Sequence, residues 1–460
     1  MSSQDKSKVW HVLGGGLVGS LAAAVLAQRG HAVELWERRS DPRLGLVERG
    51  RSINLAISER GFKALELIGM RSTVMEAGIP MRGRMIHGLD GTTRFSSYDP
   101  QGERAIYSIE RHRLNCMLLD AASALPNVTM HFDRRLTDLD LHGRCLRDQN
   151  DHVWPMRGPV LATDGAGSLV RTAIGHARGT ATNIAPLSHS YKELTLLADC
   201  GLERHALHIW PRKALMLIAL PNGDGTFTCT LFLANEGLNS FSDLAESGRM
   251  AQFFASQFPD FPLDFQEAEK QLTANPLGHL ATVRCPSWSF EDVLILGDAA
   301  HAIVPFFGQG MNAGFEDVRL LAEMLKEPPH RPPPGTSCRP PPQAGEVYQR
   351  GSFCDVFSLF ERNRKPDVDA IANMALDNFI EMRDRVADPV HMLHRVVESR
   401  AERELHGQYV SRYSLVSFSN VPYREAEERG IQNQKTLEAV CKNISDPDDV
   451  DLTVLGRGGS

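Results

Sequence analysis

The sequence has 460 residues, 42% of them hydrophobic, which suits one large domain or two closely joined domains around a substantial core. The formal net charge of −7 is spread without long acidic or basic runs, which argues against a nucleic-acid partner and against an anionic membrane surface. The eight cysteines are scattered, with no C-x-x-C pair, and this pattern indicates a reducing compartment and no metal site.

The chain opens with a polar segment that runs directly into a predicted strand over residues 8–13, so no secretory signal is expected. The apolar run 12–27 approaches the lower limit of about 17 residues for a membrane span. Four glycines crowd the first half of this run, which favours a strand, a turn and a helix of small residues instead. We therefore expect no integral membrane segment.

The turn after this strand carries a G-x-G-x-x-G pattern formed by Gly14, Gly16 and Gly19. The first glycine permits a tight turn, the second lets a pyrophosphate approach the backbone, and the third lets the helix lie close to the strand. A second strand over residues 32–36 ends at Glu37, which is placed to bind ribose hydroxyls. The pattern predicts dinucleotide binding, and the alternative is a purely structural glycine-rich turn.

The next segment is predicted to alternate loops and helices. Residues 49–69 indicate a polar loop followed by an amphipathic helix, and residues 90–101 are rich in turn formers. A further helix is expected from Ser108, with Arg111 near its start. Arg111 could pair with a phosphate or a carboxylate, or it could be a solvated arginine of the first turn.

Glu37 marks a first acidic turn at a strand end, and a second acidic turn follows another predicted strand, over residues 159–163. Asp164 and Gly165 stand at the end of this strand and lead into a helix. No second G-x-G-x-x-G pattern appears in the sequence, so a nicotinamide cofactor would have no Rossmann unit of its own.

The middle third changes from strand–helix alternation to antiparallel strands. Strands are predicted over residues 206–210, 213–220 and 226–233, with a hairpin turn at 222–225. Residues 180–285 are therefore expected to form a sheet-rich insert that covers one side of a pocket. Trp210, Met216 and Phe232 are candidate lining residues, or alternatively ordinary core residues.

A third acidic turn lies in residues 293–317. An apolar strand is broken by Gly297 and Asp298, a loop follows, and a helix is predicted from Met311 onward. An acid at the tip of such a strand can accept hydrogen bonds from cofactor hydroxyls, and free N–H groups at a helix start can stabilise an anion. His301 is either a structural neighbour of this turn or a proton relay.

The C-terminal third begins with a proline-rich segment, 327–345, that is predicted to be an exposed connector. Helices are expected over residues 346–425, with a fresh helix start at Pro366, followed by a polar and loosely ordered tail, 426–460. Asn378 and Glu381 are three residues apart and share one helix face, where they border either a pocket or solvent.

Three of these stretches, GGGLVG at 14–19, DG at 164–165 and GDAAH at 297–301, together resemble the single-component FAD-dependent aromatic hydroxylases. The resemblance implies FAD as cofactor and NADPH as co-substrate. It also implies an α/β fold, with a Rossmann-type FAD-binding domain, an inserted and mostly antiparallel sheet domain for the substrate, and a C-terminal helical region. The FAD-binding domain would comprise residues 1–179 and 286–326. The residues implied to contact FAD are Gly14, Gly16, Gly19, Glu37, Arg111, Asp164, Gly165, Gly297, Asp298, Gly310, Met311 and Asn312.

Longer stretches resemble one family within that group, the kynurenine 3-monooxygenases. These stretches are RGRSINLA at 49–56, MRGRMIH at 81–87, LHIWPR at 207–212, FTCTLF at 227–232, PFFGQGMN at 305–312 and RYSLVSFS at 412–419. The resemblance implies that Arg84, Tyr98 and Tyr413 bind the carboxylate of L-kynurenine and that Asn378 and Glu381 lie close to the substrate. Residues implied to border the ring site are Phe306, Gln309, Met216 and Phe232.

The activity implied by this resemblance is 3-hydroxylation of L-kynurenine with NADPH and dioxygen, through a flavin hydroperoxide, in tryptophan catabolism. No side chain is expected to act as a nucleophile, since no G-x-S-x-G turn is present. Two alternatives stay open: an FAD-dependent hydroxylase of another aromatic acid, and a flavin-binding protein that acts through interactions rather than catalysis.

Eukaryotic members of the family commonly carry a hydrophobic C-terminal anchor for the mitochondrial outer membrane. This sequence ends instead in the polar stretch KNISDPDDVDLTVLGRGGS. We therefore expect a soluble, cytoplasmic protein, with mitochondrial outer-membrane association left open as the alternative that the family resemblance implies. The sequence also leaves the oligomeric state open.

Overall fold

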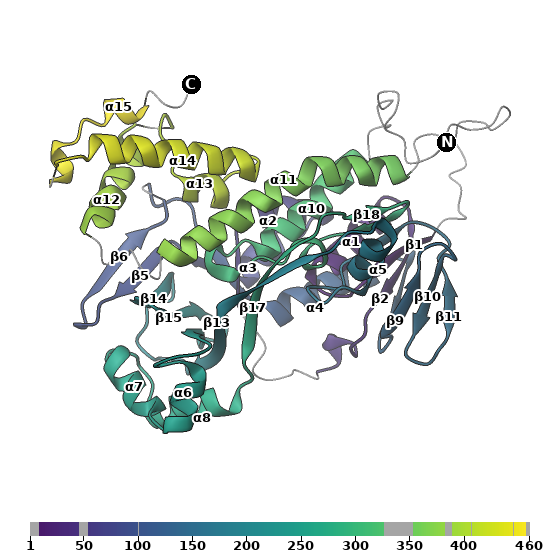
Figure 1. Cartoon of the computed structure of the whole chain (residues 1–460), viewed down its shortest axis with the longest axis horizontal. Coiled ribbons are helices and arrows are strands. Elements are labelled where there is room, and N and C mark those ends of the chain that lie inside the picture. The colour runs from purple at the N-terminus through teal and green to yellow at the C-terminus, as the bar shows by residue number, and fades with distance from the viewer. Residues whose placement is uncertain are drawn as a thin grey trace.

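The structure is a computed structural model, and it describes residues 9–45, 54–99, 101–325, 353–381, 389–405, 407–444 and 446–456. The predicted connector 327–345 and the first five residues of RGRSINLA lie outside the described residues. Figure 1 shows two sheets that lie at opposite ends of the molecule, with the long helix α11 (Phe353–Ile380) running across it and the C-terminal helices gathered at one end.

The first sheet has six strands in the order β18-β19-β12-β1-β2-β8, parallel except at the β18 edge. Its strands are β1 (Val9–Leu13), β2 (Ala32–Trp36), β8 (Val128–His131), β12 (Val160–Ala162), β18 (Ser289–Phe290) and β19 (Val293–Ile295). The strands predicted here from the sequence are confirmed. Trp10, Val12 and Leu13 are all buried, as expected for a parallel strand covered on both faces.

Helices cover this sheet. They are α1 (Leu17–Gln28), α4 (Arg111–Ser123), α5 (Leu169–Arg178), α9 (Asp298–His301) and α10 (Gly310–Met324). Helix α1 packs against both α4 and α10, and its buried alanines Ala22, Ala23 and Ala24 keep the three helices close. The carboxyl ends of β1, β12 and β19 consequently meet the starts of α1, α5 and α9 at one edge of the sheet.

The second sheet has seven strands in the order β17-β13-β16-β15-β14-β5-β6 and is antiparallel except between β14 and β5. Its strands are β5 (Gly83–His87), β6 (Thr93–Ser97), β13 (Asn183–Leu196), β14 (Ala206–Arg212), β15 (Leu215–Pro221), β16 (Phe227–Ala234) and β17 (Gly278–Arg284). The three strands predicted for the middle third are confirmed. Strand β6, within the turn-rich stretch 90–101, was not predicted, because it is an exposed edge strand without the apolar alternation that would reveal it.

Three helices cover one face of this second sheet: α6 (Phe241–Ser247), α7 (Met250–Gln257) and α8 (Phe265–Ala274). Successive residues of a strand point to opposite faces, so Trp210 and Leu217 pack under these helices while Ile209 and Met216 face the other way. Trp210 is therefore a core residue, which confirms the second of the two interpretations offered for it. Periodicity groups the residues of a face but does not identify which face meets the pocket.

Two small sheets complete the α/β part of the chain. One is formed by β3 (Asn54–Ile57), β7 (Ile106–Glu110) and β4 (Ile79–Met81), and the other by β11 (Val153–Pro155), β10 (Cys145–Asp148) and β9 (Leu136–Asp140). Helices α2 (Glu59–Leu65) and α3 (Arg71–Ala77) contact the first of these sheets, η2 (Glu66–Ile68) follows α2, and η1 (Pro42–Leu44) contacts α4. The predicted helix start at Ser108 is wrong, because Ser108 pairs with both Ala56 and Ile79 in the sheet and the helix begins at Arg111.

The C-terminal region is helical through most of its described length. Its elements after α11 are α12 (Pro389–Glu404), α13 (Arg412–Ser417), α14 (Tyr423–Val440), η5 (Pro447–Asp449) and α15 (Thr453–Gly456). The expected loosely ordered tail is wrong, since α14 packs against α11 through Tyr423, Ala426 and Gly430 on one face. The expected helix start at Pro366 is also wrong, because α11 continues through this proline with Arg364 and Asp367 buried on either side. No helix within the described residues has the length and apolar character needed to span a membrane.

Four charged side chains form a buried ionic cluster between these regions, namely Arg60, Glu316, Asp317 and Arg364. Arg364 lies 2.8 Å from both Glu316 and Asp317, and Arg60 lies 3.0 Å from Glu316. Burial alone would raise the pKa of Asp317, but His301 and Arg364 together hold it below its ordinary value. The cluster joins α2, α10 and α11 into one unit.

Replacing Arg364 with alanine should lower the free energy of unfolding by about 3–5 kcal/mol, because two buried carboxylates would lose their shared cation. The control is Arg362→Ala, which removes an exposed arginine from the same helix. Denaturant unfolding of both variants tests this, and a loss in Arg364→Ala below about 1 kcal/mol would contradict the role of the cluster.

Candidate active site

Of the three glycines in the G-x-G-x-x-G pattern between β1 and the first turns of α1, two are closely packed and one is open. A Cβ at Gly14 (φ +107°) would lie 2.5 Å from the carbonyl oxygen of Thr163, and one at Gly19 would lie 1.9 Å from the carbonyl oxygen of Gly14. A Cβ at Gly16 would meet no protein atom within 4 Å. Gly14 and Gly19 are therefore required by the fold, whereas Gly16 leaves the backbone open to a ligand.

Glu37 and α4 hold this loop from two sides. The Glu37 carboxylate accepts hydrogen bonds from the backbone N–H groups of Gly15 (2.8 Å) and Arg39 (2.9 Å). Asn115 donates its side-chain N–H to the carbonyl oxygen of Gly15 at 3.3 Å. Arg111, one turn earlier on α4, has an exposed side chain. The sequence analysis missed Asn115, although its i+4 spacing from Arg111 was a usable signal.

The second acidic turn is held by Asp164. One oxygen of its carboxylate accepts the N–H groups of Leu169 (2.8 Å) and Val170 (3.4 Å) at the start of α5. The other oxygen, Oδ1, is buried and has no hydrogen-bond partner among the described residues. Burial raises the pKa of Asp164. Gly165, with φ +82° and nothing within 4 Å of a Cβ position, leaves the turn open beside it.

The third acidic turn is tied to the buried ionic cluster. The N–H group of Gly297 (φ +59°) donates to the Asp317 carboxylate at 3.0 Å, and the same carboxylate lies 2.6 Å from Nε2 of His301. The Asp298 side chain is exposed. This geometry favours the structural role for His301, which is buried and held by Asp317 behind the turn.

The start of α10 is fixed through Asn312. Its side chain donates to the carbonyl oxygens of Ala56 and Gly308, both at 2.9 Å, and accepts from the N–H of Ser58 at 3.0 Å. The Asn312 side chain is thus committed to the protein, so only the backbone of Gly310, Met311 and Asn312 is available to a cofactor. A 15-residue helix presents free N–H groups and a partial positive charge at this end.

The donors and acceptors gathered here fit FAD. A pyrophosphate needs an open glycine backbone, which Gly16 provides, and hydroxyl groups need unpaired acceptors. The buried Oδ1 atoms of Asn115 and Asp164 are such acceptors, and Asp298 presents a third carboxylate. No group of three or more potential metal ligands is gathered in the part of the chain that the structure describes.

The three residues implied to bind a carboxylate converge from distant parts of the chain. The Arg84 guanidinium of β5 lies 5.5 Å from the ring centre of Tyr98 and 5.3 Å from that of Tyr413 on α13. The two tyrosine rings stack on each other at 4.9 Å. Burial raises the pKa of Tyr413 well above its usual value, so its hydroxyl stays protonated and can donate a hydrogen bond.

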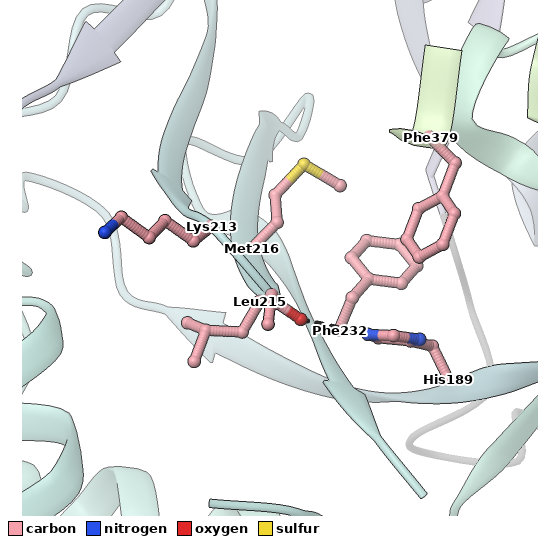
Figure 2. Close-up of a pocket in the computed structure, with 7 residues that line it drawn as sticks. His189, Lys213, Leu215, Met216, Phe232 and Phe379 are labelled. Carbon is pink, nitrogen blue, oxygen red and sulfur yellow. Dashed lines mark hydrogen bonds between the residues drawn. The ribbon is translucent and has the colours of Figure 1, made fainter. Parts of the chain in front are cut away.

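Aromatic rings form a wall beside this cluster. Phe306 of η3 (Pro305–Phe307) lies 5.2 Å from Phe232 of β16 and 4.4 Å from Phe379 of α11, measured between ring centres. Phe232, Phe379 and Met216 line a small apolar pocket, with His189 at its side (Figure 2). Phe307 connects the wall to the group of Arg84, Tyr98 and Tyr413, because its ring stacks on that of Tyr413 with 5.9 Å between ring centres. Phe379 was not predicted from the sequence.

Two apolar residues missed by the sequence analysis join the wall to the tyrosines. Leu207 of β14 and Ile218 of β15 pack against both the cluster that contains Phe306 and the one that contains Tyr98. Ile218 is two residues from Met216, so strand alternation places both on one face. That alternation was the available signal.

The two polar residues predicted on α11 have protein partners. The Asn378 side chain donates a hydrogen bond to the carbonyl oxygen of Phe306. Glu381 lies 3.3 Å from His391 and 3.7 Å from Arg412, and it thereby connects α11 to α12 and α13. Both side chains are therefore used in contacts within the protein, and their closeness to a substrate stays a prediction.

Gln309, two residues after Phe307 in the same loop, is also buried. Its Oε1 atom accepts a hydrogen bond of 2.9 Å from the hydroxyl of Tyr423 on α14. Tyr423 lies in the region predicted to be helical, 346–425, but no role at the site was predicted for it.

Comparisons with known proteins agree with this geometry. A family model described as an FAD binding domain matches residues 6–329. A kynurenine 3-monooxygenase of Myxococcus xanthus is 42% identical, over 98% of this chain and 94% of that protein. The Stenotrophomonas maltophilia enzyme of the same name is 39% identical, over 98% and 96%. In Dictyostelium discoideum the corresponding relative is 36% identical, over 95% and 93%.

Among solved structures, a tetrameric 2-methyl-3-hydroxypyridine-5-carboxylic acid oxygenase is similar with a TM-score of 0.64 and 20% identity, covering 86% of this chain and 96% of that one. PqsL of P. aeruginosa, in complex with 2-aminobenzoylacetate, is similar with a TM-score of 0.62 and 18% identity, covering 82% and 97%. At these identities the likeness shows the fold.

Two glycine variants should separate cofactor binding from folding. Gly16→Ala should weaken FAD binding by about tenfold or more and leave the thermal stability of the apoprotein unchanged, because the added methyl group meets only the ligand side. Gly19→Ala should destabilise the apoprotein itself, because its methyl group would meet the Gly14 backbone. Flavin fluorescence titration and thermal unfolding measure the two effects. Equal loss of stability in both variants would contradict the division.

The lowered pKa of Glu381 predicts how the free energy of unfolding depends on pH. Burial alone would raise the pKa of this carboxyl group, but the hydrogen bond from His391 and the nearby positive charges lower it from 4.5 to about 2. A depressed folded pKa gives stability that is present above pH 4.5 and is lost as the pH falls towards 2. The stability gap between the wild type and Glu381→Gln should therefore close across this interval.

Glu428→Gln, at an exposed position on α14, is the control for this acid titration. Acid unfolding followed by circular dichroism measures all three proteins. A gap between the wild type and Glu381→Gln that is unchanged from pH 7 to pH 2.5 would contradict the prediction.

Proposed function

This chain belongs to the kynurenine 3-monooxygenase family of FAD-dependent monooxygenases, and on that premise we propose that it hydroxylates L-kynurenine at ring position 3 with NADPH and dioxygen. The observation that carries the proposal is the joining of a carboxylate-binding cluster to an aromatic wall. Arg84, Tyr98 and Tyr413 form the cluster, and Phe307 connects it to the ring of Phe306. L-Kynurenine carries both groups that such a site recognises, an amino-acid carboxylate and an aromatic amine.

The carboxylate end of the substrate is bound by a fixed charge and two neutral donors. Arg84 offers a planar fork that matches a carboxylate, and it is half-buried, which strengthens the interaction. The hydroxyls of Tyr98 and Tyr413 add hydrogen bonds, and their stacked rings support the guanidinium. Together these residues orient the substrate so that its ring enters the apolar side of the site.

The ring end is enclosed by Phe232, Phe306 and Met216, which exclude water from the reacting carbon. Asn378 holds the backbone of Phe306 through its carbonyl oxygen, so the wall keeps its position during turnover. The arylamine of the substrate donates electron density to the carbon beside it. The ring is thereby activated without a protein base.

The cofactor would be held by the three acidic turns. The backbone at Gly16 and the start of α10 would bind its phosphates and ring, and Glu37, Asp164 and Asp298 would accept hydrogen bonds from its hydroxyls. Bound FAD supplies the redox chemistry, accepting a hydride from NADPH and activating dioxygen. The product, 3-hydroxykynurenine, would place the protein in tryptophan degradation.

The test is an NADPH oxidation assay on the FAD-loaded protein with L-kynurenine, in which the product is identified by mass and by comparison with 3-hydroxykynurenine. A parallel assay with 4-hydroxybenzoate tests the alternative that the protein hydroxylates another aromatic acid. NADPH oxidation that L-kynurenine does not stimulate, with no hydroxylated product, would overturn the proposal and favour a non-catalytic flavin-binding protein.

Arg84→Ala should weaken L-kynurenine binding by about 10- to 100-fold, the loss expected for charge-assisted hydrogen bonds. FAD binding should not change, since Arg84 belongs to the group with Tyr98 and Tyr413 and not to the turns proposed to hold FAD. Arg82→Ala is the matched control, because Arg82 is exposed and two residues away on the same segment. Substrate titration by flavin absorbance measures both variants, and unchanged affinity in Arg84→Ala would refute this role.

A further inference from the structure

Residues 305–312 lie at the boundary between the proposed cofactor and substrate sites, and they are held by side chains from two distant segments and by the segment's own Asn312. Asn378 of α11 donates to the carbonyl oxygen of Phe306. Asn312 connects Gly308 to the end of β3. At Gln309 the contact comes from the hydroxyl of Tyr423, which lies 2.9 Å from its side-chain oxygen. The Tyr423 contact differs from the others because it fixes a side chain rather than the backbone.

The ring of Tyr423 is itself held firmly. It is fully buried, and the guanidinium of Arg60 lies 3.9 Å from its centre, with that of Arg364 at 5.5 Å. Both arginines belong to the buried ionic cluster, so their positions are fixed by Glu316 and Asp317. Cation–π attraction and close packing therefore leave the ring one orientation.

The hydroxyl of Tyr423 acts as a donor. Burial raises the pKa of this phenol, and the Glu316 and Asp317 carboxylates add to the effect, although Arg60 and Arg364 act in the opposite direction. A protonated hydroxyl directed at Gln309 selects the amide orientation in which Oε1 accepts, and the NH2 group then points away from Tyr423. The buried cluster thus determines which face of the Gln309 amide is presented to the rest of the site.

We infer that Tyr423 is a positioning residue that orients the Gln309 amide at the boundary between cofactor and substrate, so that NADPH oxidation is coupled to hydroxylation. The inference rests on the proposed function. In uncoupled turnover one NADPH, one O2 and one proton give NADP⁺ and one hydrogen peroxide, and no substrate is hydroxylated. A misdirected Gln309 amide would shift turnover towards this outcome.

Tyr423→Phe tests the inference, because it keeps the ring between the arginines and removes only the hydroxyl. We expect hydrogen peroxide formed per NADPH consumed to rise about fivefold, the loss expected for one hydrogen bond, with an unchanged FAD dissociation constant and unfolding temperature. Gln309→Ala should raise the ratio by a similar factor. The double variant should not raise it further, because both changes remove the same interaction.

Tyr409→Phe is the matched control. The hydroxyl of Tyr409 donates to Glu398 at 3.2 Å in a separate cluster of the C-terminal region, so its loss should leave the peroxide ratio at the wild-type value. An unchanged ratio in Tyr423→Phe would overturn the inference. Additive increases of the peroxide ratio in the double variant would also overturn it, as would an equal increase in Tyr409→Phe.

A second measurement is independent of turnover. In holoenzyme labelled with ¹⁵N at the glutamine side chains, the Gln309 amide signal is identified by its loss in Gln309→Ala. Tyr423→Phe should shift and broaden that signal, and Tyr409→Phe should leave it unchanged. If the wild type forms no 3-hydroxykynurenine, the proposed function fails, and this signal alone decides whether Tyr423 positions Gln309. An unaltered signal in Tyr423→Phe would overturn the positioning role.

Discussion

The buried ionic cluster of Arg60, Glu316, Asp317 and Arg364 is the constraint on which the site depends. Charges in a low-dielectric interior are tolerated only when each is paired and hydrogen-bonded, so the positions of these four side chains determine one another. Asp317 also accepts the N–H of Gly297, and Arg60 donates to the carbonyl oxygen of Val416 in α13. The acidic turn after β19 and the C-terminal helices are therefore fixed relative to each other by one set of contacts.

This constraint explains how an FAD-dependent monooxygenase builds one site from segments that are far apart in sequence. The proposed cofactor side uses loops at the carboxyl ends of β1, β12 and β19, whereas the proposed substrate side uses one face of the seven-stranded sheet. Helix α11 crosses both sheets (Figure 1) and contributes Arg364 to the cluster and Phe379 to the aromatic wall. Tyr423 connects the cluster to Gln309, so the interior that stabilises the fold also reaches the boundary between the two sites.

Much of the fold and of the candidate site could be predicted from the sequence, and the wrong predictions share one cause. The glycine turns and the central strands follow from local rules of periodicity and turn chemistry. Predictions failed where a tertiary contact overrides local composition. Strand β6 is polar and exposed, Pro366 lies within a helix that buried neighbours maintain, and α14 is polar on all but the face that packs on α11. The positions of Asn115, Phe379 and Tyr423 depend on such contacts and were not predicted.

The grouping of Arg84 with two tyrosines was implied by the family resemblance, and the fold makes it from distant parts of the chain. The sequence by itself determined other parts of the available chemistry, namely three acidic turns at strand ends and an aromatic segment around Phe306. These depend on residue type and spacing along one strand or helix, which the chain carries locally. Only the tertiary structure decided which of these groups remain free for a ligand and which are used by the protein. Asn312 and Glu381 have partners more than five residues away in sequence, whereas Gly16 and Oδ1 of Asp164 do not. Hydrogen bonds and ion pairs between distant segments are set by packing, which no local pattern encodes.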